Sequence, residues 1–157
     1  RILPLVCRGE KLLSIGMTES EAGSALTDLV TSATKDGKTY IIDGEKRWIT
    51  GAGEREFTLV YARFNEVPGP EGIGAILLEE GMPGYTYGPR IRSLGVRGVR
   101  EGVLLFDQVR VPEENLVVAP GSAFANLMSA YNGQRVGASA VALGITQGAF
   151  HSVALDN

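Results

Sequence analysis

The chain has 157 residues, of which 44% are hydrophobic and 21% are charged, a balance typical of a globular domain with one buried core. A formal net charge of −3 gives no basic field to hold a nucleic-acid backbone, and the longest apolar stretch, residues 136–145, is too short to span a membrane. The single cysteine, Cys7, excludes an internal disulfide, and we expect a cytoplasmic protein.

Short β-branched and aromatic runs fill the chain from Lys11 to Val118, and Gly, Pro, Asn and Asp separate them. This spacing predicts a mainly β domain built as a sandwich or barrel. The Asp36-Gly37 pair predicts a hairpin, because Gly accepts the positive φ of a tight turn. An irregular strand is expected at Tyr85, Tyr87 and Pro89. The other expected strands are residues 12–17, 30–34, 39–43, 47–50, 58–63, 74–79 and 103–109.

The pattern changes to helical spacing after Pro120-Gly121, and it predicts one long helix of roughly 30 residues. Glycines at 133, 137, 144 and 148 would let a second helix approach closely, so we expect partner helices from outside this sequence. We divide the chain into a β domain, residues 1–120, and the start of a helical domain, residues 121–157. Both ends are expected to be cut from a longer protein.

Two segments of the β domain suit a ligand. The run Met17 to Ser24 ends in a Gly-Ser turn whose backbone N–H groups and hydroxyls could hold a phosphate or the edge of a planar ring. The competing explanation is local: Thr18, Ser20 or Ser24 caps a short helix, and Gly23 supplies a positive φ.

The second segment contains Trp48, the only tryptophan, and Thr50. Alternation along a strand places their side chains on one face, so that an aromatic plane stands beside a hydroxyl. This arrangement suits a planar ring with hydrogen-bonding edges. An ordinary core tryptophan is the alternative.

Taken together and in this order, the spaced blocks resemble the acyl-CoA dehydrogenase family, and the resemblance covers almost the whole chain. The blocks are Met17-Thr18-Glu19 with Gly23-Ser24, Asp43-Gly44 with Lys46, Trp48-Ile49-Thr50, Leu94 to Gly98, Phe106 to Pro112, Asn115-Leu116, Arg135, Ala142 to Ile145, and Gln147 to Ala149.

The resemblance implies an FAD site. It places the strand with Ile15, Met17 and Thr18 beside the isoalloxazine ring, with the Thr18 hydroxyl near flavin N5. Gly23 and Ser24 would form a turn shared by the FAD pyrophosphate and the acyl-CoA chain. Trp48, Ile49 and Thr50 would form the wall against the flavin.

On the long helix, the resemblance implies that Asn132 and Arg135 hold the CoA moiety. The family usually has Asp where this chain has Asn132, Pro at Ser20 and Asp at Ala25. The last two departures concern the geometry of the loop.

The family's reaction removes an α-proton with a carboxylate while the β-hydrogen leaves as hydride to flavin N5. No catalytic residue is identified in this chain, because the alternative base position on the helix holds Gln134, and an amide cannot replace a carboxylate base. In one hypothesis the base is a Glu beyond Asn157 and the whole protein dehydrogenates an acyl-CoA. In a second it belongs to a base-less branch such as the acyl-CoA desulfinases, and in a third it is a non-catalytic binding or assembly module.

The expected partners follow from the resemblance: an acyl-CoA substrate, an electron-transfer flavoprotein or similar acceptor, and further copies of the chain in a dimer or tetramer. No metal site is expected, because His151 is the only histidine and has no cysteine nearby.

Overall fold

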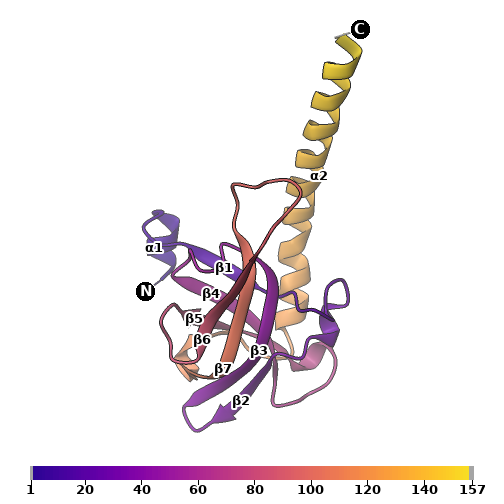
Figure 1. The fold of residues 1–157 in the computed structure, drawn as a ribbon. Helices are drawn as coiled ribbons and strands as arrows, with labels where there is room; N and C mark the ends of the chain where they lie inside the picture. Colours follow the sequence, from indigo (N-terminus) through magenta and orange to yellow (C-terminus); the bar gives the residue numbers. More distant parts are fainter. Residues whose placement is uncertain (1, 156–157) are drawn as a thin grey trace. The chain divides into compact units, whose positions relative to one another are not determined.

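The computed structural model describes residues 2–155 (Figure 1). Contacts between Cα atoms divide the chain into two compact units, Arg1–Ala123 and Phe124–Asn157. The elements in chain order are α1 Leu3–Cys7, β1 Leu13–Gly16, the 3-10 helix Leu26–Asp28, β2 Ser32–Asp36, β3 Thr39–Thr50, β4 Phe57–Phe64, the 3-10 helix Pro70–Gly72, β5 Ile73–Glu79, β6 Tyr85–Ile91, β7 Glu101–Pro112, the 3-10 helix Glu113–Asn115, β8 Leu116–Val118 and α2 Ala123–Leu155.

The first unit is a single eight-stranded sheet that folds back on itself. Its strands follow the order β6-β7-β3-β2-β4-β5-β8, and β1 joins it by pairing parallel to β4. The hydroxyls of Tyr85 on β6 and Thr58 on β4 nevertheless lie 2.8 Å apart, although three strands separate β6 from β4 in this order. The two ends of the sheet therefore face each other, which is the expected sandwich-like arrangement.

Apolar side chains from both ends of the sheet fill the space between these two layers. Val60 on β4, Ile76 and Leu78 on β5, and Leu104 on β7 are all 0% exposed and belong to one cluster. These strands carry buried residues at successive positions rather than in strict alternation, as on β5, because both of their faces are covered. The core thus lies inside the fold of the sheet.

The longest pairing joins β3 to β7, the two twelve-residue strands at the centre of Figure 1. Its register slips twice along β3, between Ile42 and Gly44 and between Lys46 and Ile49. Such β-bulges bend a strand and redirect its side chains. The second bulge lies just before the predicted ligand wall.

Most expected strands are present, with two differences. Residues 39–43 and 47–50 form one strand, β3, because the chain passes the first bulge at Gly44 without leaving the sheet. The irregular strand expected at Tyr85 is β6, an edge strand whose register shifts between Tyr87 and Arg90. The short elements α1 and β8 were not expected. The Asp36-Gly37 hairpin is confirmed, with Gly37 at a φ of 59°.

The second unit is the 33-residue helix α2, as the helical spacing predicted. Along it, Val136, Val141, Leu143, Ile145 and Phe150 are each between 64% and 71% exposed. Among residues 2–155, no helix is long and apolar enough to cross a membrane.

Candidate functional site

The segment after β1 and the centre of β3 are fastened together by a buried ion pair. The Lys46 ammonium donates to the Met17 carbonyl (3.0 Å) and to Glu19 Oε1 (2.6 Å). The side chains of Lys46 and Glu19 are only 0% and 5% exposed. One backbone bond, from Arg47 N–H to the Thr18 carbonyl at 2.8 Å, adds to this fastening. Residues 17–19 are therefore held in one position against β3.

Burial and pairing act in opposite directions on the two charges. Burial lowers the pKa of Lys46 to about 8, although Glu19 opposes this change. Burial would raise the pKa of Glu19, but the Lys46 charge and hydrogen bonds from Lys46, Thr31 and Val30 outweigh it and leave that pKa below its ordinary value. Glu19 is thus a carboxylate at neutral pH.

Trp48 lies directly after this fastening and is not a core residue. The residue is 52% exposed, and its φ of 54° lies in the left-handed region that residues other than Gly rarely occupy. The Arg47 guanidinium carbon is 5.7 Å from the centre of the ring. Because strained backbone concentrates at binding sites, the bulge marks Trp48 as a presented side chain rather than a packing residue.

The neighbours of Trp48 differ in what they present. Thr50 is exposed on the same side as Trp48, but its hydroxyl already donates to Glu101 Oε1 at 2.8 Å. Ile49 is 3% exposed and belongs to the core cluster, so its side chain faces away from Trp48. On β1, Ile15 is 38% exposed. Of the predicted wall, Trp48 therefore offers the largest free surface.

The run from Thr18 to Ser24 does not cap a helix. The nearest 3-10 helix, Leu26–Asp28, has Ala25 at its N-cap and no capping side chain, and Gly23 is not among the positive-φ glycines. The hydroxyls of Thr18 and Ser24 have no partner among the described residues. A Cβ at Gly23 would meet nothing within 4 Å. Free hydroxyls thus lie beside open space.

Ser20, which stands where the family often has Pro, also fastens this loop to β3. Its hydroxyl donates to Glu45 Oε1 (2.8 Å) and accepts from Arg47 Nη1 (3.2 Å). The departure at this position therefore provides contacts that Pro could not make.

On α2, Asn132 and Arg135 lie one turn apart, and Arg135 Nη1 donates to Asn132 Oδ1 at 3.1 Å. Gln134 and both of these residues are exposed. Asn132 thus accepts a hydrogen bond from the arginine one turn later on the same helix.

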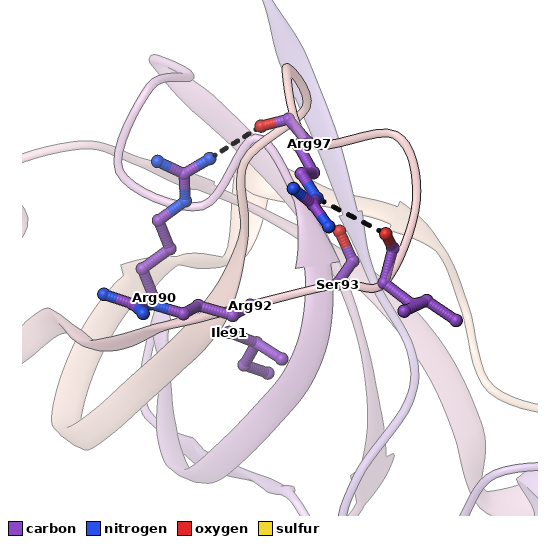
Figure 2. Close-up of a pocket in the computed structure, with 6 residues that line it drawn as sticks. Arg90, Ile91, Arg92, Ser93 and Arg97 are labelled. Atoms are coloured by element: carbon purple, nitrogen blue, oxygen red, sulfur yellow. Dashed lines mark hydrogen bonds between the residues drawn. The ribbon is translucent and has the colours of Figure 1, made fainter.

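A second feature was missed by the sequence analysis. Arg90, Arg92 and Arg97 line a hollow of about 930 Å³ formed by the end of β6 and the loop that follows it, as Figure 2 shows. Arg90 donates to the Arg97 carbonyl at 3.1 Å, and none of the three forms an ion pair within the described chain. The available signal was the absence of Asp and Glu from Gly81 to Arg100 in an acidic protein.

The model of the family described as acyl-CoA dehydrogenase, middle domain, matches residues 14–109. The chain belongs to the acyl-CoA dehydrogenase family. The resemblance inferred from the spaced motifs is therefore confirmed, as is the mainly β fold followed by one long helix.

Relatives within this family carry different names. The 3-sulfinopropanoyl-CoA desulfinase of Paraburkholderia xenovorans is 46% identical over 156 residues, which cover 97% of this chain and 39% of that protein. The short-chain specific acyl-CoA dehydrogenase of Megasphaera elsdenii is 38% identical over 149 residues, covering 94% of this chain and 39% of the relative. The structure of butyryl-CoA dehydrogenase from Megasphaera elsdenii matches with a TM-score of 0.86 and 37% identity, over 91% of this chain and 38% of that one. The chain thus spans well under half the length of these relatives.

Proposed function

We propose that this chain is the FAD-binding middle part of an acyl-CoA dehydrogenase that carries out α,β-dehydrogenation of an acyl-CoA thioester. The observation that carries the proposal is the bulge that presents Trp48, within a family member, beside the unpartnered hydroxyl of Thr18. One backbone hydrogen bond, Arg47 N–H to Thr18 O, fixes the distance between them. FAD fits this arrangement because its ring system is planar and its edges accept and donate hydrogen bonds.

In this proposal each described residue has a binding or orienting task. The Trp48 ring would pack against the flavin, and the unpartnered Thr18 hydroxyl would donate a hydrogen bond to its edge. Ile15, Met17, Ile49 and Thr50 complete the surroundings, and Gly23 with Ser24 admits the pyrophosphate and the acyl chain into open space. Bound FAD supplies the hydride acceptor for the β-hydrogen.

Substrate binding extends to α2 in the same proposal. Arg135, oriented by Asn132, binds the CoA moiety as a cation. Gln134 cannot take the α-proton, so the base is a carboxylate supplied by another part of the whole protein.

The test uses the full-length protein that contains this chain. We expect it to purify with the visible absorption of FAD and to be bleached by an acyl-CoA without oxygen. Arg135→Gln should raise KM for the acyl-CoA with little effect on FAD content, whereas Trp48→Ala should lower FAD affinity. A full-length protein that neither carries nor takes up FAD would refute the proposal.

A desulfinase activity is a second candidate, because identity to a desulfinase is 46% and identity to a short-chain dehydrogenase is 38%. The absence of a carboxylate at Gln134 suits a branch without a base. The two candidates separate when the full-length protein is given 3-sulfinopropanoyl-CoA and butyryl-CoA in parallel. Sulfite release from the first without bleaching by the second supports the desulfinase, and the reverse supports the dehydrogenase.

An electron-transfer flavoprotein or similar carrier is the proposed acceptor of electrons. The arginine-lined hollow supports an acidic partner, and the same loop reaches the end of β3 through the bond from Gly51 N–H to Arg100 O at 2.7 Å. Arg90→Glu should slow reoxidation by the carrier, most strongly at low salt, without changing bleaching by substrate.

Self-association into a dimer or tetramer is proposed from the exposed apolar residues of α2, among them Ile145 and Phe150. A cytoplasmic location is also proposed, supported by the exposed free thiol of Cys7.

A further inference from the structure

Lys46 is the largest of the fully buried side chains in the described residues. Its charge is removed from water entirely, and its two partners are the Met17 carbonyl and the Glu19 carboxylate. Well-packed apolar side chains in place of a buried ion pair are often neutral or stabilising, because burying two charges is costly. Packing alone therefore does not explain this pair.

Glu19 connects the pair to a third segment. Its Oε2 accepts from Val30 N–H at 2.7 Å and its Oε1 accepts from Thr31 N–H at 3.0 Å. The Thr31 hydroxyl then donates to the Glu45 carbonyl at 3.1 Å, which closes the network on β3. Three segments far apart in sequence, residues 17–19, 30–31 and 45–46, are thereby held together at one point.

The network ends at the two groups that face the proposed flavin. Lys46 lies two residues before Trp48, at the bulge where the register of β3 slips. On the other side, Met17 accepts from Lys46, and the next residue is Thr18, with its unpartnered hydroxyl. A change of the pair would therefore displace Thr18 and the Trp48 bulge relative to each other.

We propose that Lys46 and Glu19 are positioning residues that set Thr18 against the Trp48 bulge and thereby tune the affinity and the electronic environment of the flavin. This inference rests on the proposed function, because it concerns the same FAD site. Neither residue touches the flavin itself. The lowered pKa of Lys46 reflects burial, which outweighs the opposing effect of Glu19.

The alternative is a purely structural pair, and a matched variant separates the two. Val111 is 0% exposed on β7 and pairs with Tyr40, near the end of β3 opposite to Trp48. Val111→Ala removes buried apolar volume and lowers stability without touching the three segments. It shows what loss of stability alone does to the flavin.

The experiment compares full-length holoprotein of wild type, Lys46→Met, Glu19→Asp and Val111→Ala. Each is stripped of FAD and reconstituted, and the FAD Kd, the visible spectrum and the flavin midpoint potential are measured. We expect Lys46→Met and Glu19→Asp to weaken FAD binding by roughly 10- to 100-fold, the loss typical of removing an outer partner that orients a ligand in metal sites. We also expect both to shift the spectrum and potential, with Val111→Ala unchanged in all three readouts.

Glu19→Asp keeps the charge and only withdraws the carboxylate, so it provides the test if Lys46→Met does not fold. The inference is overturned if the pair variants retain the wild-type Kd, spectrum and potential, or if Val111→Ala changes them equally. In those cases wild type still binds FAD, and the proposed function stands. Wild type without any FAD binding overturns both.

Discussion

Trp48 has two unfavourable features that a core tryptophan avoids: the residue is 52% exposed, and its φ is 54°. The left-handed conformation costs roughly 1–2 kcal/mol for any residue with a Cβ. Every residue except Gly meets this cost. A pair of substitutions at position 48 can therefore separate the free-energy cost of the backbone conformation from the contribution of the indole ring.

We expect Trp48→Gly to be more stable than Trp48→Ala by about 1 kcal/mol in urea unfolding. Both variants lose the ring, so the difference reports only the strained φ. At an ordinary strand position, a protein with Gly is less stable than the same protein with Ala. If Trp48→Gly were likewise less stable than Trp48→Ala, the backbone at position 48 would not be strained. Both variants should lose FAD affinity in the full-length protein.

Lys46 makes stability depend on pH above neutrality. Its pKa is about 8 in the folded chain and its ordinary value is 10.5, so between these values the unfolded state binds more protons than the folded state. The free energy of unfolding should therefore rise as pH increases through this window. Relative to Lys46→Met, we expect wild type to gain about 2 kcal/mol between about pH 7.5 and about pH 9.5.

The comparison with Lys46→Met cancels the other groups that titrate in this range. In wild type Glu19 is ionised across this window, because the Lys46 charge and hydrogen bonds hold its pKa below the ordinary value of 4.5. Equal pH profiles for the two proteins would show that Lys46 does not titrate in this window.

At the residue scale, the sequence proposed ligand-facing side chains but not their supports. Trp48 and Thr50 stood out because an aromatic plane beside a hydroxyl suits a planar ring, and Thr18 was proposed from the family resemblance. Glu19 and Lys46 appeared only as letters of family motifs, because charged residues give no sign in sequence that they are buried together. Their 27-residue separation is bridged where residues 17–19 lie against β3, joined to it by the bond from Arg47 N–H to the Thr18 carbonyl.

Among the elements, the turn between β5 and β6 contains two glycines with the same backbone but different surroundings. Gly81 and Gly84 both have a φ of 84°. A Cβ at Gly81 meets nothing within 4 Å, whereas a Cβ at Gly84 would lie 2.0 Å from the Asp107 carbonyl oxygen on β7. The two positions therefore separate backbone strain from steric clash.

We expect Gly81→Ala to lower the free energy of unfolding by about 1 kcal/mol, from strain alone. Gly84→Ala should cost about 3 kcal/mol or more, because strain and displacement of β7 add. Chemical denaturation of both variants measures the difference. Similar losses of stability in the two variants would mean that the β7 backbone at Asp107 moves aside for the new Cβ without a measurable loss of free energy.

The elements that the sequence failed to predict have identifiable reasons. Residues 39–43 and 47–50 were separated because Gly44 interrupts the pattern, yet Gly44 only bulges, at a φ of 135°, where Thr31 packs over it. β6, by contrast, was predicted as an irregular strand, and it tolerates Gly88 and Pro89 because it lies at the edge of the sheet. β8 has three residues and is defined by its partner β5, not by its own sequence.

At the scale of the whole molecule, we expect a substitution of an α2 glycine to stabilise the helix in this chain and to destabilise the full-length protein. Nothing lies within 4 Å of a Cβ built on Gly144 in this chain. Gly144→Ala should therefore increase helicity of the 157-residue chain, by about 1 kcal/mol of helix propensity. In the full-length protein, where a partner helix is expected over this ridge, the same change should lower stability.

Far-UV circular dichroism of the fragment and thermal unfolding of the full-length protein provide the two measurements. Ala142→Gly is the matched control, because it should lower stability in both contexts. A stabilising Gly144→Ala in the full-length protein would contradict close packing at this ridge.

The pairing of β3 with β7 also affects how the chain is made. Thr39 on β3 pairs with Pro112 and Thr50 pairs with Glu101, so β3 leaves the ribosome long before its partner. At about 5–20 residues per second, this edge waits for several seconds beside the finished hairpin with β2. Unpaired flat edges invite aggregation, and bulges protect them by twisting the strand. The distortion that presents Trp48 in the folded protein therefore also guards the nascent chain against pairing with the wrong neighbour.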